Sequence, residues 1–168
     1  MGNLLFSPSG RIGPGQFMSG ATILVVIGLL IALLPVFVPA LVMLNIIGLV
    51  LIWCWVVIWV KRYHDGGKSG WMCLIPIVIY LVLGGILGAV LAGMFVDVEA
   101  AERMASATEA GDIGALMKFA GSGGMTTTGG IIAAVATAAL SYVIALVFNN
   151  MIKHDAHDNQ FGPEAGTA

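Results

Sequence analysis

The chain has 168 residues, of which 59% are hydrophobic and 10% charged, and its mean hydropathy is +1.00. A soluble domain carries about a quarter charged residues. This chain has too few charges to cover a globule with a polar surface, which excludes a soluble enzyme. The formal net charge is −2 with seven Lys and Arg residues, which argues against a nucleic-acid partner. The composition instead predicts that the partner is the lipid bilayer.

Three long segments without Asp, Glu, Lys or Arg predict the membrane spans, and they cover residues 12–60, 69–96 and 119–152. A helix needs about 20 apolar residues to cross the hydrocarbon core, so the first segment is long enough for two helices. Pro35 and Pro39 place the turn between these helices at 36–38. The sequence therefore predicts an all-α fold in a single membrane domain. It is an integral membrane bundle of four transmembrane helices, at about 16–34, 40–60, 71–96 and 130–151.

The basic residues predict the orientation of this bundle. Four crossings leave both termini on one side, together with the loop between the second and third helices. That side holds most of the Lys and Arg residues, and the positive-inside rule then places it in the cytoplasm. Residues 97–129 become a periplasmic loop and residues 152–168 a cytoplasmic tail. The basic residues of the cytoplasmic side are Arg11, Lys61, Arg62, Lys68 and Lys153, against Arg103 and Lys118 on the other side.

The 97–129 loop is expected to be partly helical. Residues 106–109 fit a capping box that would begin one short helix. Asp112 is placed to cap a second, whose apolar residues share one face and which Gly121 would end. These helices either lie at the outer membrane interface or form a docking face for a larger membrane complex.

Few residues suggest chemistry. The middle parts of the predicted helices contain no Asp, Glu, Lys, Arg or His, although such residues usually mark the route of a coupled transporter. His154 and His157, with His64 and Asp65, could hold a divalent cation, but a solvated tail with freely titrating histidines is the simpler interpretation. We therefore expect no catalytic residues, no cofactor and no metal site.

Three motifs in chain order carry a resemblance to a known family. They are Arg-Tyr-His-Asp at 62–65 followed by Gly-Lys-Ser-Gly-Trp at 67–71, a Gly-Arg-Ile segment at 10–12 within residues 6–17, and Asn-Gln-Phe-Gly-Pro at 159–163. Together they resemble domain-of-unknown-function family 805, which consists of small bacterial inner-membrane proteins. The resemblance implies a location in the bacterial cell inner membrane, but it supplies no activity, substrate or cofactor.

The topology places all three motifs on the cytoplasmic side, so we expect them to meet in one patch. The tail would fold back onto the loop between the second and third helices. Arg11 and Arg62 would pair with Asp65 or with the phosphates of anionic lipid head groups. The patch is then either a clamp that fixes the bundle or a ligand site. Its candidate residues are Arg11, Arg62, His64, Asp65, Lys68, Trp71, Asn159, Phe161, Gly162 and Pro163.

Taken together, these observations predict a non-enzymatic multi-pass membrane protein. We expect a structural or accessory subunit of a larger membrane protein complex, since a small protein with glycine-rich helices is suited to packing against others, including copies of itself. The alternative is a small transporter or channel that uses the cytoplasmic His/Asp/Arg patch as its gate or binding site.

Overall fold

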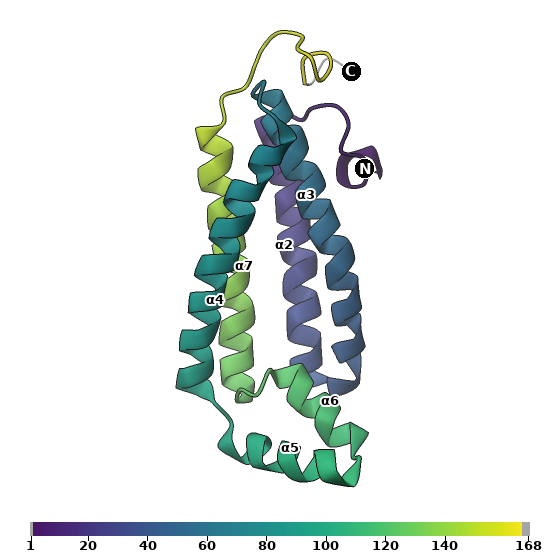
Figure 1. The fold of residues 1–168 in the computed structure, drawn as a ribbon, viewed down its shortest axis with the longest axis vertical. Helices are drawn as coiled ribbons and strands as arrows, with labels where there is room; N and C mark the ends of the chain where they lie inside the picture. The colour runs from purple at the N-terminus through teal and green to yellow at the C-terminus, as the bar shows by residue number, and fades with distance from the viewer. Residues whose placement is uncertain (1, 166–168) are drawn as a thin grey trace.

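The computed structural model describes residues 2–165 and confirms the all-α bundle. Four long helices run side by side along the longest axis, and both termini lie at one end of them, here called the termini end (Figure 1). Two shorter helices cross the opposite end, here called the loop end. The described elements are α1 (Gly2–Leu5), α2 (Pro14–Phe37), η1 (Pro39–Ile46), α3 (Ile47–Asp65), η2 (Gly70–Cys73), α4 (Leu74–Phe95), α5 (Val98–Ala110), α6 (Ile113–Ser122) and α7 (Thr127–Met151).

Four segments of the described chain are long and apolar enough to cross a membrane. Many of their large Leu, Ile and Val side chains face outward, an exposure to water that would be unfavourable in a soluble protein. In the third segment, only 6% of the most apolar 18-residue stretch is buried inside the chain. Lipid removes this penalty, because it is as apolar as the side chains themselves. The chain is therefore a multi-pass membrane protein. Its spans are Pro14–Phe37, Pro39–Asp65, Gly70–Phe95 and Thr127–Met151.

The first two spans differ from the predicted boundaries at the prolines and at the charged end. Pro35 does not end α2 but lies inside its last turn, so the expected turn at 36–38 is wrong. The helix ends at Phe37, the N–H of the following Val38 donates to Leu34 O over 2.9 Å, and Pro39 then begins the next span as a 3-10 helix. The α3 helix continues through the polar residues 61–65, beyond its predicted end at residue 60, because those side chains are largely buried against other segments.

Each of the two helices at the loop end, α5 and α6, is capped by an aspartate at its N-terminus. Asp97 accepts a hydrogen bond from Ala100 N over 2.9 Å and caps α5, so the capping box expected at 106–109 is wrong, since those residues lie within that helix. Asp112 caps α6 as predicted, by accepting from Ala115 N over 3.1 Å. The α6 helix passes the predicted stop and ends before Gly123, which has the left-handed φ of 62°.

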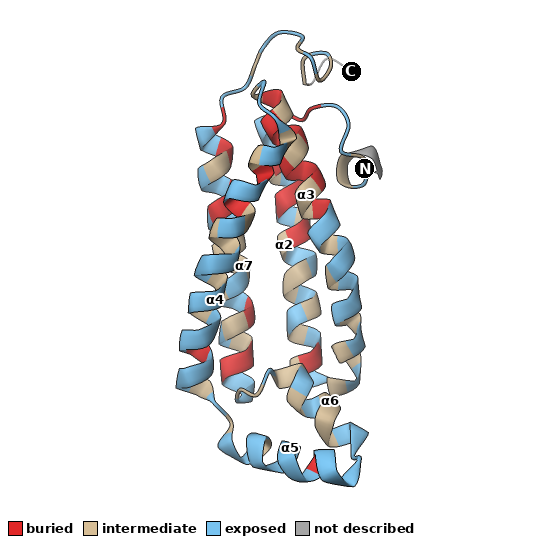
Figure 2. Ribbon diagram, viewed as in Figure 1, coloured by how far each residue is buried: buried red, intermediate tan, exposed pale blue. Residues whose placement is uncertain are grey.

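The bundle is packed most tightly near the termini end, where the buried residues gather (Figure 2). Trp59 of α3 lies between Phe17 of α2, with ring centroids 4.5 Å apart, and Phe148 of α7, at 6.1 Å. The α2 helix packs on α3 and α7, and α7 also packs on α4. From the short η2 turn, α3 and α4 diverge and make no extensive contact along the part described (Figure 1). The bundle is thus closed at one end and open along its middle.

Gly129 tests the close approach of α7 to the end of α4. A Cβ at this position would overlap the Cβ of Phe95 and lie 2.9 Å from its Cγ. Gly129→Ala should therefore lower stability by about 1–3 kcal/mol through overpacking, measured as a lower Tm in detergent. Gly93→Ala is the control, because a Cβ there meets nothing within 4 Å. Equal melting temperatures for the two variants would contradict this packing.

Candidate functional site

A buried carboxylate organises the termini end. Asp65 is the last residue of α3 and is 0% exposed. Its Oδ1 accepts from Arg11 Nη2 over 3.1 Å, and its Oδ2 accepts from Arg62 Nη1 over 2.8 Å. The ring Nδ1 of His154 lies 2.9 Å from the same Oδ2. We call Asp65, Arg11, Arg62, His154 and Asn149 the Asp65 cluster; it joins α3, α7, the N-terminal segment and the tail.

Arg62 connects α3 to the end of α7. It lies one helical turn before Asp65, which lets both side chains point the same way. Its Nε donates to Asn149 Oδ1 over 2.6 Å, and its Nη2 donates to Asn149 O over 3.0 Å and to Ile152 O. The last carbonyls of a helix lack partners within it and carry partial negative charge. The buried guanidinium satisfies those carbonyls and is itself stabilised by them.

Arg11 connects the N-terminal segment to the tail. Its Nη1 donates to His157 O over 2.6 Å, and its Nη2 donates to Asp155 O as well as to the Asp65 carboxylate. The adjacent Ile12 N donates to Lys61 O over 3.3 Å, which holds the segment against α3. Because the Arg11 side chain is only 2% exposed, its guanidinium donors are shielded from water.

The tail folds back onto the end of α3 and the turn that follows it. The rings of His64 and Phe161 stack with centroids 3.8 Å apart and an interplanar angle of 3°. Asn159 Nδ2 donates to His64 O over 3.1 Å, and Asp155 N donates to Asp65 O over 3.0 Å. His64 Nδ1 lies 3.1 Å from Gly10 O, so the tail, α3 and the N-terminal segment meet at one imidazole.

A glycine makes this approach possible. A Cβ at Gly66 would lie 2.8 Å from Ile152 Cγ2 and 3.1 Å from the backbone oxygen of Lys153. The chain leaving α7 therefore passes against a backbone that has no side chain in the way. This contact explains why the helix-ending position after Asp65 is a glycine.

The structure does not bring every predicted patch residue into this site. Lys68 is exposed and Trp71 is 79% exposed, so both lie outside the Asp65 cluster. Gly162 has φ +134° and forms an isolated bridge with Asn159 that shapes the tail, and Pro163 is exposed beside it. Arg11, Arg62, His64, Asp65, Asn159 and Phe161 do come together.

Sequence reasoning missed two members of the site. Asn149 was not singled out, although a polar residue at the end of an apolar helix marks a position that could receive a buried donor. The sequence suggests His154 as a metal ligand or as a freely titrating residue of a solvated tail, whereas in the structure its ring pairs with Asp65. Among residues 2–165, no group of three or more His, Cys, Asp and Glu side chains is placed to hold a metal ion. The His157 side chain is 90% exposed, and the Asp65 carboxylate already accepts from two guanidinium groups.

Two tail residues have shifted pKa values. The hydrogen bond to Asp65 raises the pKa of His154 above its usual 6.5, and Glu164, whose Oε1 lies 3.5 Å from His154 Nε2, adds to the effect. The hydrogen bond from the Asn159 amide lowers the pKa of Asp155. The charged forms of both side chains are therefore favoured in the folded tail.

Asp65→Asn tests the central charge. The change removes the carboxylate but keeps its size, and it leaves two buried guanidinium groups without their counter-charge. A loss of about 3–5 kcal/mol is expected, measured as a large drop of Tm in detergent. Glu99→Gln is the matched control, because it breaks an ion pair whose side chains are 64% and 79% exposed and which contributes under about 1 kcal/mol. Similar losses in the two variants would exclude a central role for Asp65.

The raised pKa of His154 predicts that the stability of the folded tail depends on pH. Because folding raises the pKa of His154, its contribution to stability is complete below about pH 6.5 and falls as the pH rises through the raised value. Hydrogen exchange at Asp155 N, which donates to Asp65 O, should report this loosening. His154→Gln should remove the dependence, and His157→Gln, at an exposed ring, should retain it. A wild-type pH profile that matches the His154→Gln profile would contradict the assignment.

The comparisons with known proteins place the chain in a family. No curated protein and no solved structure matches it. The family model described as "Protein of unknown function (DUF805)" matches residues 5–163, a range that includes every member of the Asp65 cluster and the tail that folds onto it. Since that match covers nearly the whole described chain, the protein belongs to the DUF805 family, whose function is unknown.

Proposed function

We propose that the protein is a non-enzymatic structural or accessory subunit of a larger assembly in the bacterial inner membrane. The observation that carries the proposal is the outward face of α4. Only 6% of the most apolar 18-residue stretch of its span is buried inside the chain. Three small residues lie on exposed positions at four-residue spacing: Gly85, Ala89 and Gly93. Small residues at this spacing let a second transmembrane helix approach closely.

The basic residues support an orientation with both termini in the cytoplasm. Five of the seven Lys and Arg residues belong to the termini end, and positive charge is retained on the cytoplasmic side of inner-membrane proteins. The loop end, with α5 and α6, then faces the periplasm. Lys68 is exposed beside the cluster and is available to anionic lipid head groups.

The Asp65 cluster supports a structural role better than a catalytic one. Its guanidinium groups donate to the Asp65 carboxylate and to backbone carbonyls, and the carboxylate accepts from three side chains. A general base or a nucleophile needs a reactive atom that a substrate can approach, whereas these atoms are buried and already bonded. The cluster fixes the positions of the helices and the tail.

A small transporter is the second candidate, and the observation that favours it is a cavity between the four spans, lined in part by Asn45, Thr137 and Ser141. A transport path would have to pass the termini end, where Trp59 and the Asp65 cluster are buried. A polar path across a purified oligomer would favour this candidate over the accessory subunit.

Ala89→Leu tests the proposed interface. A tagged chain is extracted from native membranes in mild detergent, and whatever co-migrates on a native gel is identified by mass spectrometry. The wild type should carry a stoichiometric partner, and Ala89→Leu should reduce its recovery about tenfold, which corresponds to about 1.4 kcal/mol of lost packing. Ala139→Leu, at an exposed alanine of α7, is the control. A wild-type chain that migrates alone, or only with copies of itself, would exclude the accessory-subunit proposal.

A further inference from the structure

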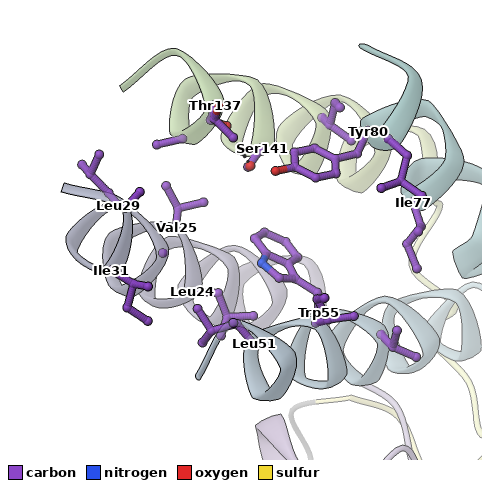
Figure 3. Close-up of a pocket in the computed structure, with 18 of the residues that line it drawn as sticks. Leu24, Val25, Leu29, Ile31, Leu51, Trp55, Ile77, Tyr80, Thr137 and Ser141 are labelled. Atoms are coloured by element: carbon purple, nitrogen blue, oxygen red, sulfur yellow. Dashed lines mark hydrogen bonds between the residues drawn. The ribbon is translucent and has the colours of Figure 1, made fainter. Parts of the chain in front are cut away.

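The divergence of α3 from α4 leaves a cavity of about 670 Å³ inside the bundle. It lies between α2, α3, α4 and α7, at the depth of the membrane spans, and its wall is almost entirely apolar. Figure 3 shows the side chains that surround it, with Leu24 and Val25 on one wall and Thr137 and Ser141 on the opposite one. Gly28 lines the cavity, and a Cβ there would meet nothing within 4 Å, so the space beside this residue is open.

The size of the cavity decides what kind of molecule it can hold. Sites for small molecules occupy about 300–1,000 Å³, a range that includes this cavity.

The route into the cavity indicates where the molecule comes from. The termini end is closed by the aromatic contacts of Trp59 with Phe17 and Phe148, and by the buried Asp65 cluster beyond them. At the loop end, α6 packs against η1 and α2, and a Cβ at Gly121 would lie 2.9 Å from Pro35 O. The remaining side lies between α3 and α4, which make no extensive contact along the part described, and in a multi-pass membrane protein this side faces the hydrocarbon core. A molecule already dissolved in the bilayer reaches the cavity without crossing water.

Two hydrogen-bond donors point into this apolar space. The indole of Trp55 and the phenol of Tyr80 project from α3 and α4 into the cavity (Figure 3), and neither has a hydrogen-bond partner among residues 2–165. Ser141, on the facing helix, donates to Thr137 O over 2.9 Å and keeps lone pairs free. An unpaired donor in a membrane interior is costly, so an occupant that brings an acceptor oxygen is favoured over plain hydrocarbon.

We propose that the cavity binds one apolar bilayer molecule that carries an acceptor oxygen on its hydrocarbon body and enters between α3 and α4. The oxygen accepts from Tyr80 or from Trp55, and the rest of the molecule lies against the apolar wall beside Gly28. An ester carbonyl of a phospholipid and a ring carbonyl of a prenylated quinone both have this chemistry. The proposal does not depend on the accessory-subunit function, because it concerns the inside of the bundle and not its outer face.

The test uses two photoreactive probes in nanodiscs of phosphatidylethanolamine and phosphatidylglycerol that contain the full-length protein. One probe is a phospholipid with a diazirine on its acyl chain, and the other is an azidoquinone with a prenyl tail. At least one of the two probes should label the peptides that contain Trp55 and Tyr80. The probe that labels them shows whether the bound molecule is a phospholipid or a quinone. The proposal is overturned if the probes label only outward-facing residues of α4. It is also overturned if the wild-type protein forms a dimer and these peptides stay unlabelled.

Matched variants separate the cavity from the outer surface. Ala138 lines the cavity, whereas its neighbour Ala139 is exposed and does not line it. Ala138→Phe should reduce labelling about tenfold by filling the space, and Ala139→Phe should leave it unchanged. Gly28→Phe is a second filling variant, in case the first lowers stability. Labelling that persists in both filled variants would overturn the site.

The acceptor oxygen has its own test. Tyr80→Phe keeps the ring and removes the donor, so labelling at subsaturating probe should fall about threefold, the effect of one lost hydrogen bond. Tyr142→Phe, at an exposed tyrosine outside the cavity, is the control. Unchanged labelling in both Tyr80→Phe and Trp55→Phe would overturn the requirement for an oxygen and leave a site for plain hydrocarbon chains.

Discussion

The carboxylate of Asp65 neutralises part of the charge of two arginine side chains that the fold removes from water. One negative charge faces two guanidinium groups, and below the raised pKa of His154 it also faces that imidazolium, so the carboxylate alone does not balance the site. Backbone carbonyls supply the remainder, at the C-terminal end of α7 for Arg62 and in the tail for Arg11. Removing any one contributor leaves a buried cation short of partners, and this makes the N-terminal segment, α3, α7 and the tail depend on one another.

A buried ionic cluster has a special use in a membrane protein. Between transmembrane helices, lipid provides no hydrophobic driving force, so packing and polar contacts decide which helices meet. An ionic contact has strict geometry and few alternative partners. An apolar helix face, such as those of α4, can pack against many different partners. The cluster therefore specifies the arrangement at one end, and away from that end α3 and α4 make no extensive contact among the described residues. The cavity is a consequence of where the polar contacts are placed.

The sequence predicted the spans well because charge is excluded from the membrane interior, and gaps between charged residues are visible without any structure. It placed Arg11 and Arg62 on the same side of the membrane as Asp65, with either that carboxylate or lipid phosphates as their partners, and the structure pairs both with Asp65. It did not predict that α2 passes through Pro35, since the lost hydrogen bond is tolerable in a last turn. Nor did it place Asn149 in the site, because the partner carbonyls of a guanidinium depend on where α7 ends in space.

His64 shows how the motifs, far apart in the sequence, form a single site. Its ring stacks on Phe161 of the third motif, and its Nδ1 lies beside Gly10 of the first, while its own helix carries Arg62 and Asp65 of the second. The guanidinium groups and the carboxylate at this end are buried and bonded to one another or to backbone carbonyls, which is the pattern of a clamp and not of an open binding pocket. Two donors without a partner among residues 2–165, the indole of Trp55 and the phenol of Tyr80, lie elsewhere, in the apolar cavity between the spans. Polar groups therefore have two roles in this fold: at the termini end they fix the helices, and in the cavity they remain available to a molecule from the bilayer.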